Sequence, residues 1–229
     1  MRIASLSLLT ILCLALSVPA FAGTIFDDGP LNGTSNAFFI DGSRGPFTQS
    51  ISDGFMAASS GTGTEVFFAE WVLAGTTPTG VGYSIGPNNF QLPINTASGF
   101  GADLLCTNGS PFNGGVCAGG FGYDVYLSHF DITGGFSFTA GQTYWLTLTN
   151  ATDSGGTGFN GWDLNNGPAT CLFETGTIVQ GGGSGCGAAG ESFTITGGST
   201  GTTPEPSSIL LFGSGILGLA GVLRRKLTR

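Results

Sequence analysis

The sequence predicts an all-β protein whose body folds as a two-sheet β-sandwich of the jelly-roll type. Three observations support this class. Short segments that alternate apolar and polar residues recur along the chain, and Asn-Gly and Asp-Gly pairs, which favour tight turns, lie among them. The composition is rich in small and aromatic residues, with 42 Gly and 19 Phe among 229 residues. No window of the body carries the apolar period of an amphipathic helix. A parallel β-helix is the alternative, although no regular repeat period supports it.

The first 22 residues predict an export signal. Met1 and Arg2 form a short basic start, residues 3–18 are apolar, and Ala20-Phe21-Ala22 has the small-residue pattern of a cleavage site. We therefore exclude residues 1–22 from the folded body and expect signal peptidase to leave Gly23 at the mature N-terminus. An uncleaved N-terminal membrane anchor is the alternative.

The β-sandwich domain is expected over residues 23–196. Its predicted strands are 37–40, 65–73, 81–85, 123–130, 136–138, 143–149 and 192–196. The clearest is 143–149, where Tyr144, Leu146 and Leu148 alternate with polar residues and should face the core, which leaves Trp145 on the opposite face. The predicted turns are the Asp-Gly pair at 53–54 and the Asn-Gly pairs at 108–109, 113–114, 160–161 and 166–167.

The charge of the body excludes one class of partner. Residues 23–203 contain thirteen acidic residues and a single basic one, Arg44, which gives a net charge of −12. Such a surface repels phosphate groups, so we expect no nucleic-acid partner.

The cysteines indicate an oxidising compartment. Cys13 leaves with the signal peptide, and the four remaining cysteines, Cys106, Cys117, Cys171 and Cys186, allow three pairings. We favour Cys106–Cys117 and Cys171–Cys186, because each pair encloses a Gly-rich loop. Neither spacing fits the tight pairs of a zinc site, so we expect no bound zinc.

No constellation for catalysis is found. His129 is the single histidine, and the sequence has no G-x-S-x-G motif around a nucleophilic serine. Glu65 and Glu70 are the candidate carboxylate pair of a glycosidase, but an odd offset on one strand places them on opposite faces. We therefore expect a protein that is not an enzyme, with a hydrolase as a less favoured class.

Two kinds of ligand remain as hypotheses. Trp145 and Trp162 are candidates for a carbohydrate-binding platform, and Trp145 is the better one because it alternates with threonines on the non-core face. Asp163, Asn165 and Asn166 carry oxygen ligands of the type that Ca²⁺ prefers. A plain turn is the favoured interpretation of that segment, so we expect no cofactor. If a cofactor is bound, Ca²⁺ is the candidate. Paired threonines at 147/149 and 194/196 are too few to favour ice binding.

The C-terminus combines three segments. Residues 197–203 form a flexible Gly/Thr linker, and Pro204-Glu205-Pro206 follows. Residues 207–223 carry no charge and would span about 25 Å as a helix, the lower limit for a bilayer. Arg224, Arg225 and Lys226 would stop the helix at the cytoplasmic side. A buried core helix is the alternative.

At these residues the chain resembles the PEP-CTERM sorting signal of Gram-negative bacteria. The resemblance covers residues 203–229 and rests on the tripeptide, the apolar helix and the basic end. It implies cutting near the tripeptide by exosortase, a membrane peptidase, and delivery to the cell surface or matrix. Residues 141–151 and 161–168 also resemble the closing part of PEP-CTERM surface proteins, and tails of this kind are catalogued with ice-binding proteins.

The expected function is therefore that of an exported, non-enzymatic protein of the cell surface or extracellular matrix. It would be tethered to the membrane through residues 204–229 until it is processed. A polysaccharide-binding module of the matrix is the alternative.

Overall fold

The computed structural model describes residues 23–34, 37–41, 50–156, 159–175 and 185–199, with backbone alone at 167–175, 185–189 and 199. Within these ranges the chain forms fourteen β-strands, one 3₁₀ turn and no α-helix, which confirms the prediction of an all-β body. None of the described residues belongs to a helix that could cross a bilayer. The predicted signal peptide (1–22) and membrane-spanning helix (207–223) lie outside the described residues.

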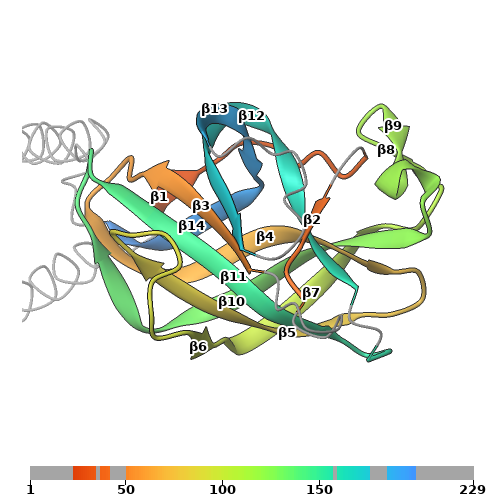
Figure 1. The fold of residues 1–229 in the computed structure, drawn as a ribbon, viewed down its shortest axis with the longest axis horizontal. Helices are drawn as coiled ribbons and strands as arrows, with labels where there is room; N and C mark the ends of the chain where they lie inside the picture. Colours follow the sequence, from red (N-terminus) through yellow and green to blue (C-terminus); the bar gives the residue numbers. More distant parts are fainter. Residues whose placement is uncertain (1–22, 35–36, 42–49, 157–158, 176–184, 200–229) are drawn as a thin grey trace, which may run out of the picture. The chain divides into compact units, whose positions relative to one another are not determined.

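One group of antiparallel strands forms the first sheet. Its order is β1-β14-β4-β10-β7. The strands are β1 (Gly23–Asp27), β14 (Phe193–Ser199), β4 (Gly61–Leu73), β10 (Tyr123–Phe138) and β7 (Ser98–Cys106). Figure 1 shows β14 and β4 side by side, with the first and last described strands of the body, β1 and β14, as neighbours. The two ends of the body are therefore held together by main-chain hydrogen bonds.

A second antiparallel group has the order β3-β11-β5-β6. Its strands are β3 (Ser50–Met56), β11 (Thr143–Asp153), β5 (Pro78–Gly86) and β6 (Asn95–Thr96). The long strand β12 (Asn160–Thr175) joins the two groups. Its first residues pair with β4 and with β2 (Ala37–Phe39), and its later residues pair with β3 and with β13 (Gly185–Glu191).

Side chains from both sheets enter a single core. Phe193 of the first sheet and Phe55 of the second meet edge to face, with ring centroids 5.3 Å apart. Tyr83 on β5 also meets Phe130 on β10, with the rings tilted by 37° and their centroids 4.6 Å apart. Aromatic pairs of this kind contribute beyond the area they bury. Leu146 and Leu148 are fully buried in this core and Tyr144 packs against it, which confirms the predicted core face of β11.

The predicted strands all lie in observed strands, but their limits differ. Segments 123–130 and 136–138 were predicted to be separate and are in fact one strand, β10. The register shifts between Asp131 and Phe136, where Gly134 and Gly135 take positive φ. The glycines therefore make an irregularity inside a strand rather than a turn. Strands β1, β3, β7 and β12 were not predicted, because their sequences are rich in Gly, Ser, Asn and Asp.

Two of the predicted turns are confirmed. Asn108-Gly109 is a turn, and Asn113-Gly114 connects β8 (Pro111–Phe112) to β9 (Gly115–Val116). Asn113 and Gly114 have φ of 45° and 79°, the signs that a type I′ hairpin turn requires.

The other three predicted turns are wrong, because the pairs at 53–54, 160–161 and 166–167 lie inside β3 and β12. Pairing with neighbouring strands satisfies their backbone groups, and this tertiary contribution outweighs the local turn preference. Strand β14 also continues to Ser199, so the folded body extends beyond the predicted boundary at residue 196. Residues 200–229 lie outside the described part of the chain.

Candidate functional site

Trp145 lies on the outer face of the second sheet. It stands opposite Gly54 on β3 and Gly86 on β5, and it is only partly buried. A Cβ added at Gly54 would lie 2.9 Å from the Cη2 and Cζ3 atoms of the indole, so the ring rests directly on the backbone of β3. The predicted non-core position of Trp145 agrees with this geometry.

Hydroxyl groups line the strands beside this indole. Thr147 Oγ1 donates to Ser52 Oγ over 3.0 Å, and Ser50 Oγ donates to Thr149 Oγ1 over 2.7 Å. The backbone N–H of Phe90, in the loop after β5, donates to Ser52 Oγ over 3.3 Å. Ser52, Thr147 and Thr149 are buried, so, of these groups, the partly buried indole of Trp145 is the one that a ligand could reach.

Trp162 does not belong to this face, and its predicted role in carbohydrate binding is wrong. Its side chain is fully buried in the core and packs against Phe68 and Phe193. Its Nε1 donates to the carbonyl oxygen of Ser192 over 3.0 Å. Trp71 is also buried. A ring without exposed surface cannot stack on a sugar, so Trp145 is the one remaining candidate among the three tryptophans.

The candidate catalytic groups do not converge. Glu65 and His129 lie at the surface, each about one-third exposed, with Nδ1 of the histidine 3.2 Å from Oε1 of the glutamate. Glu70 is buried and accepts hydrogen bonds from Ser128 Oγ (2.7 Å) and Asn160 Nδ2 (2.8 Å). The two glutamates therefore face opposite sides of β4, as their odd offset predicts.

Burial changes the titration of Glu70. Removal from water raises its pKa from 4.5 to about 7, although the bonds from Ser128 and Asn160 act in the opposite direction. The carboxyl can therefore carry a proton near neutral pH. Its two neighbours hold it in place and do not present it to a substrate.

The side chains of the candidate calcium segment lie on both faces of the strand that contains it, β12. Asp163 and Asn165 are buried on one face of β12, whereas Asn166 is exposed and accepts a bond from Asn32 Nδ2. Asp163 accepts from Trp71 Nε1 and from the Gly33 N–H, both over 2.8 Å. Because burial outweighs these bonds, the pKa of Asp163 rises from 3.8 to about 7. The strand therefore separates Asn166 from Asp163 and Asn165, and the favoured interpretation of a plain turn is wrong because the three residues lie inside β12.

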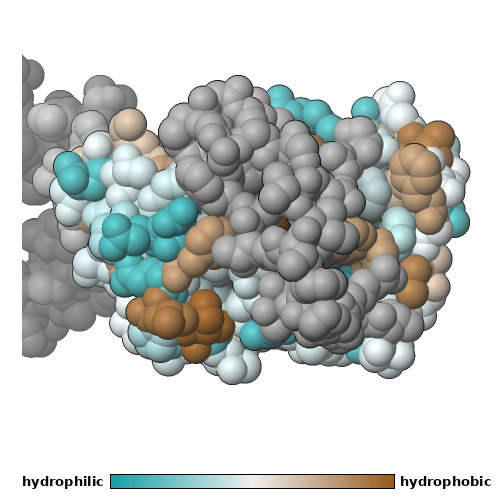
Figure 2. Space-filling model, viewed as in Figure 1, coloured by the Kyte–Doolittle hydropathy of each residue, from teal (hydrophilic) through white to brown (hydrophobic). Residues whose placement is uncertain are grey.

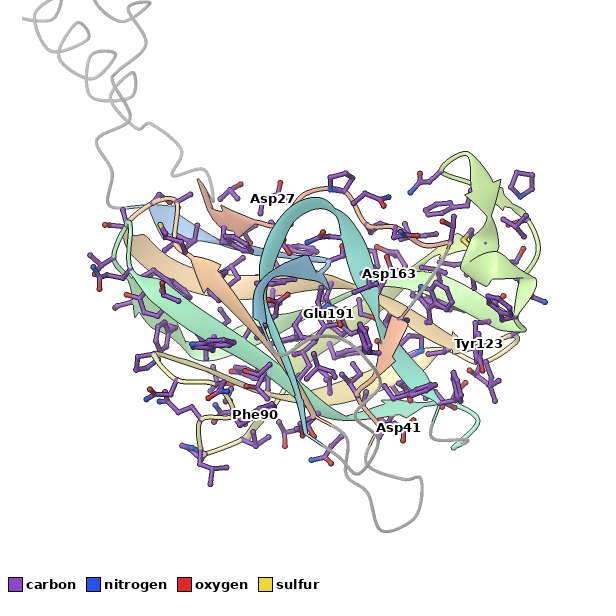
Figure 3. The ribbon with its side chains drawn as sticks, turned by 45° about the horizontal axis from the view of Figure 1, so that its top comes forward. Asp27, Asp41, Phe90, Tyr123, Asp163 and Glu191 are labelled. Carbon is purple, nitrogen blue, oxygen red and sulfur yellow. A yellow bond between two sulfur atoms is a disulfide. The ribbon has the colours of Figure 1, made fainter. Side chains whose placement is uncertain are left out.

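The structure instead brings Asn165 to a carboxylate far away in sequence. Asn165 Nδ2 donates to Asp28 Oδ2, and both side chains are buried. Burial and the negative charge of Asp53 raise the pKa of Asp28 from 3.8 to about 8. Asp53 was missed because it was assigned to a turn. Figure 3 shows that Asp163 and Glu191 lie within the body, whereas Asp27 lies at its margin.

One predicted disulfide is present. Cys106 at the end of β7 is bonded to Cys117 at the start of the 3₁₀ turn Cys117–Gly120. The two sulfurs pack with Trp71, Ala118 and Val125 in a second, smaller core. Cys171 and Cys186 are register partners on β12 and β13, but their side chains lie outside the described ones, so this pairing stays a prediction.

Apolar surface is scattered. The exposed large apolar side chains of the described residues are Met56, Leu92, Leu104, Val116 and Phe121. In the coloured part of Figure 2, apolar residues gather in small separate groups. Among the described residues on the face that Figure 2 shows, no large apolar patch is seen.

The sorting tripeptide and the basic cluster at 224–226 lie outside the described residues, so their assignment rests on sequence. The fold and the C-terminus together define the chain as an all-β protein that carries an export and membrane-sorting signal. The PEP-CTERM protein-sorting motif matches residues 202–226, which confirms the resemblance drawn from Pro204-Glu205-Pro206 and the segment after it. No curated protein matches the chain.

Proposed function

We propose that this chain is a non-enzymatic protein of the cell surface or extracellular matrix of a Gram-negative bacterium. An exosortase-type peptidase would process it near Pro204-Glu205-Pro206. The observation that carries the proposal is the sorting motif at residues 202–226, which marks an exported protein that is held at the membrane for processing. The Cys106–Cys117 disulfide supports an oxidising destination.

The body would be an acidic jelly-roll module that precedes this tail in the sequence. The strand orders β1-β14-β4-β10 and β3-β11-β5-β6 support a jelly roll, because each places sequentially distant strands side by side as Greek keys do. The separation of Glu65 at the surface from Glu70 in the core supports a role without catalysis.

Deletion of residues 204–229 tests the sorting proposal. The truncated protein should be released into the medium, while the full chain is found first in the membrane fraction and then at the surface. Glu205→Gln should slow the processing, and Asp103→Asn, which removes an exposed carboxylate from the body, should leave it unchanged. Normal surface display of the truncated protein would contradict the proposal.

A second candidate function, polysaccharide binding, is favoured by the position of Trp145. Its ring rests on Gly54 at the outer face and is only partly buried, whereas Trp71 and Trp162 are buried. Trp145→Ala should abolish retention on extracellular polysaccharide from the producing cells without unfolding the body. Phe121→Ala removes a ring that is 70% exposed from another loop and should leave retention intact. If the unaltered protein is not retained on that polysaccharide, this function is excluded.

A further inference from the structure

The glycines on either side of Trp145 are covered by two different side chains. On the outer face of the second sheet, Gly54 of β3 and Gly86 of β5 are the register partners of Trp145. The indole itself rests on Gly54. A Cβ at Gly86 would collide with the side-chain amide of Gln91, so this amide rests on the backbone of Gly86. Because opposed Cβ atoms of an antiparallel pair lie about 5 Å apart, the amide of Gln91 stands next to Trp145.

The loop that carries Gln91 is fixed to the same face. Residues 87–94 connect β5 to β6, and Phe90 among them takes a positive φ of 50°. The N–H of Phe90 (labelled in Figure 3) donates to Ser52 Oγ over 3.3 Å, so the loop reaches across β11 to a residue of β3. Thr147 Oγ1 donates to the same oxygen over 3.0 Å. The position of Gln91, the next residue along the chain, is therefore set by the sheet.

Two polar atoms beside Trp145 are left without a hydrogen bond in the described part of the chain. They are Gln91 Oε1 and Ser84 Oγ, and both atoms are buried. Ser84 lies on the same face of β5 as Gly86, two residues earlier. A buried polar atom without a partner is costly. The side chain of Gln91 as a whole is only partly buried, so its amide can turn its polar atoms toward a ligand.

The described side chains on this face carry no charge. On β3, β11 and β5 they belong to serine, threonine, methionine and Trp145, and residues 87–94 contain no acidic or basic residue. The outer face of the first sheet differs, because Glu65, His129 and Asp131 lie there. With a net charge of −12 over residues 23–203, the body repels an anionic polymer. An uncharged face also offers nothing to select a cationic one.

We propose that Trp145 and Gln91 together form a binding site for a neutral polysaccharide. This inference rests on the second candidate function and names its ligand class and a further binding residue. The indole stacks on the apolar face of a sugar ring, and the Gln91 amide exchanges hydrogen bonds with the sugar hydroxyls. An amide both donates and accepts without carrying charge, as a hydroxyl does. The ring supplies contact area, and the amide fixes the orientation of the sugar.

Retention of the full-length protein, in detergent, on immobilised polysaccharide tests the ligand class. Extracellular polysaccharide from the producing cells is divided on an anion exchanger into a neutral and an anionic fraction. The neutral fraction should retain the protein equally at about 0.05 and 0.5 M NaCl, because no charged pair is screened. The anionic fraction should not retain it. Retention on the anionic fraction alone would overturn the proposal, and retention on neither fraction would exclude the second candidate function with it.

Variants of the loop test the role of Gln91. Gln91→Ala should weaken binding to the neutral fraction about tenfold, since it removes the hydrogen bonds of the amide. Gln91→Glu keeps the size but loses both donors, and it should bind no better than Gln91→Ala. Leu92→Ala removes a side chain that is 76% exposed from the same loop and should bind as the unaltered protein does.

Two further readouts separate lost contact from a displaced loop. The melting temperature of Gln91→Ala should equal that of the unaltered protein. In a fluorescence titration with the neutral fraction, its change at saturation should also be equal, with only the midpoint moved to higher concentration. If Trp145→Ala loses retention on the neutral fraction and Gln91→Ala keeps it in full, the role of Gln91 is overturned while the second candidate function stands.

Discussion

Trp71 Nε1 donates a hydrogen bond to Asp163 Oδ1 over 2.8 Å, and this bond ties β4 to β12. The same carboxylate accepts from the Gly33 N–H, and the Gly33 carbonyl in turn accepts from the N–H of Ala118 over 2.8 Å. Ala118 follows the disulfide-bonded Cys117. One buried carboxylate therefore connects two strands to the disulfide-bonded loop.

Asp163→Ala should destabilise the body strongly. The change leaves the Trp71 indole N–H and the Gly33 N–H buried without this acceptor, which costs about 2–5 kcal/mol for the two groups. Urea unfolding followed by tryptophan fluorescence would measure it. Asp103→Ala, at an exposed position, should change the free energy of unfolding by less than about 0.5 kcal/mol. Equal stability of the two variants would show that Asp163 does not have this structural role.

The buried carboxyl of Glu70 should make stability fall as pH rises. Its pKa is 4.5 in the unfolded chain and about 7 in the folded one, so below pH 4.5 it is protonated in both states and imposes no penalty. Between these values the unfolded chain binds fewer protons, so the free energy of unfolding decreases by about 3 kcal/mol up to pH 7 and is level above it. Denaturation in EDTA at several pH values would measure this slope.

Glu70→Gln provides the control for that slope. The amide keeps the size of the side chain and an oxygen for the Ser128 hydroxyl, but it does not titrate. The pH dependence that remains should come from Asp28 and Asp163, whose pKa values are also raised. A slope in Glu70→Gln as steep as that of the unaltered protein would mean that Glu70 is not the titrating group.

Removal of the Cys106–Cys117 bond should lower the free energy of unfolding by about 3 kcal/mol. The bond closes a loop between residues separated by 11 positions, which restricts the unfolded chain. The variant Cys106→Ser with Cys117→Ser, unfolded by heat or urea, would show the loss.

Peptide mass analysis of the exported protein should also find Cys171 bonded to Cys186, and free thiols at these two positions would contradict that second pairing.

Gly54→Ala should displace the Trp145 ring. A methyl group at Gly54 would lie 2.9 Å from two ring carbons, closer than contacts allow, so the indole must tilt away from β3. We expect a cost of about 1–3 kcal/mol and weaker retention on polysaccharide. Gly198→Ala is the matched control, because a Cβ there meets nothing within 4 Å. Unchanged Trp145 fluorescence and retention would show that Gly54 does not position the ring.

Local patterns predicted the strands with strong alternation and not the others. Residues 143–149 alternate clearly, and β11 places Leu146 and Leu148 in the core as expected. The same reasoning misassigned Asp53-Gly54, because a local preference for turns says nothing about pairing with β11 and β12. Trp162 was misjudged for a related reason, since its burial depends on Phe68 and Phe193 from other strands.

The sequence by itself determined the sorting motif of this protein and its all-β class, because a sorting motif is contiguous and strand alternation is local. It also indicated the Cys106–Cys117 bond, whose partners are close in the chain. Only the tertiary structure decided which polar groups meet. Asp28 meets Asn165, and Trp71 meets Asp163, because antiparallel pairing joins strands that are far apart in sequence, and no local pattern records such contacts.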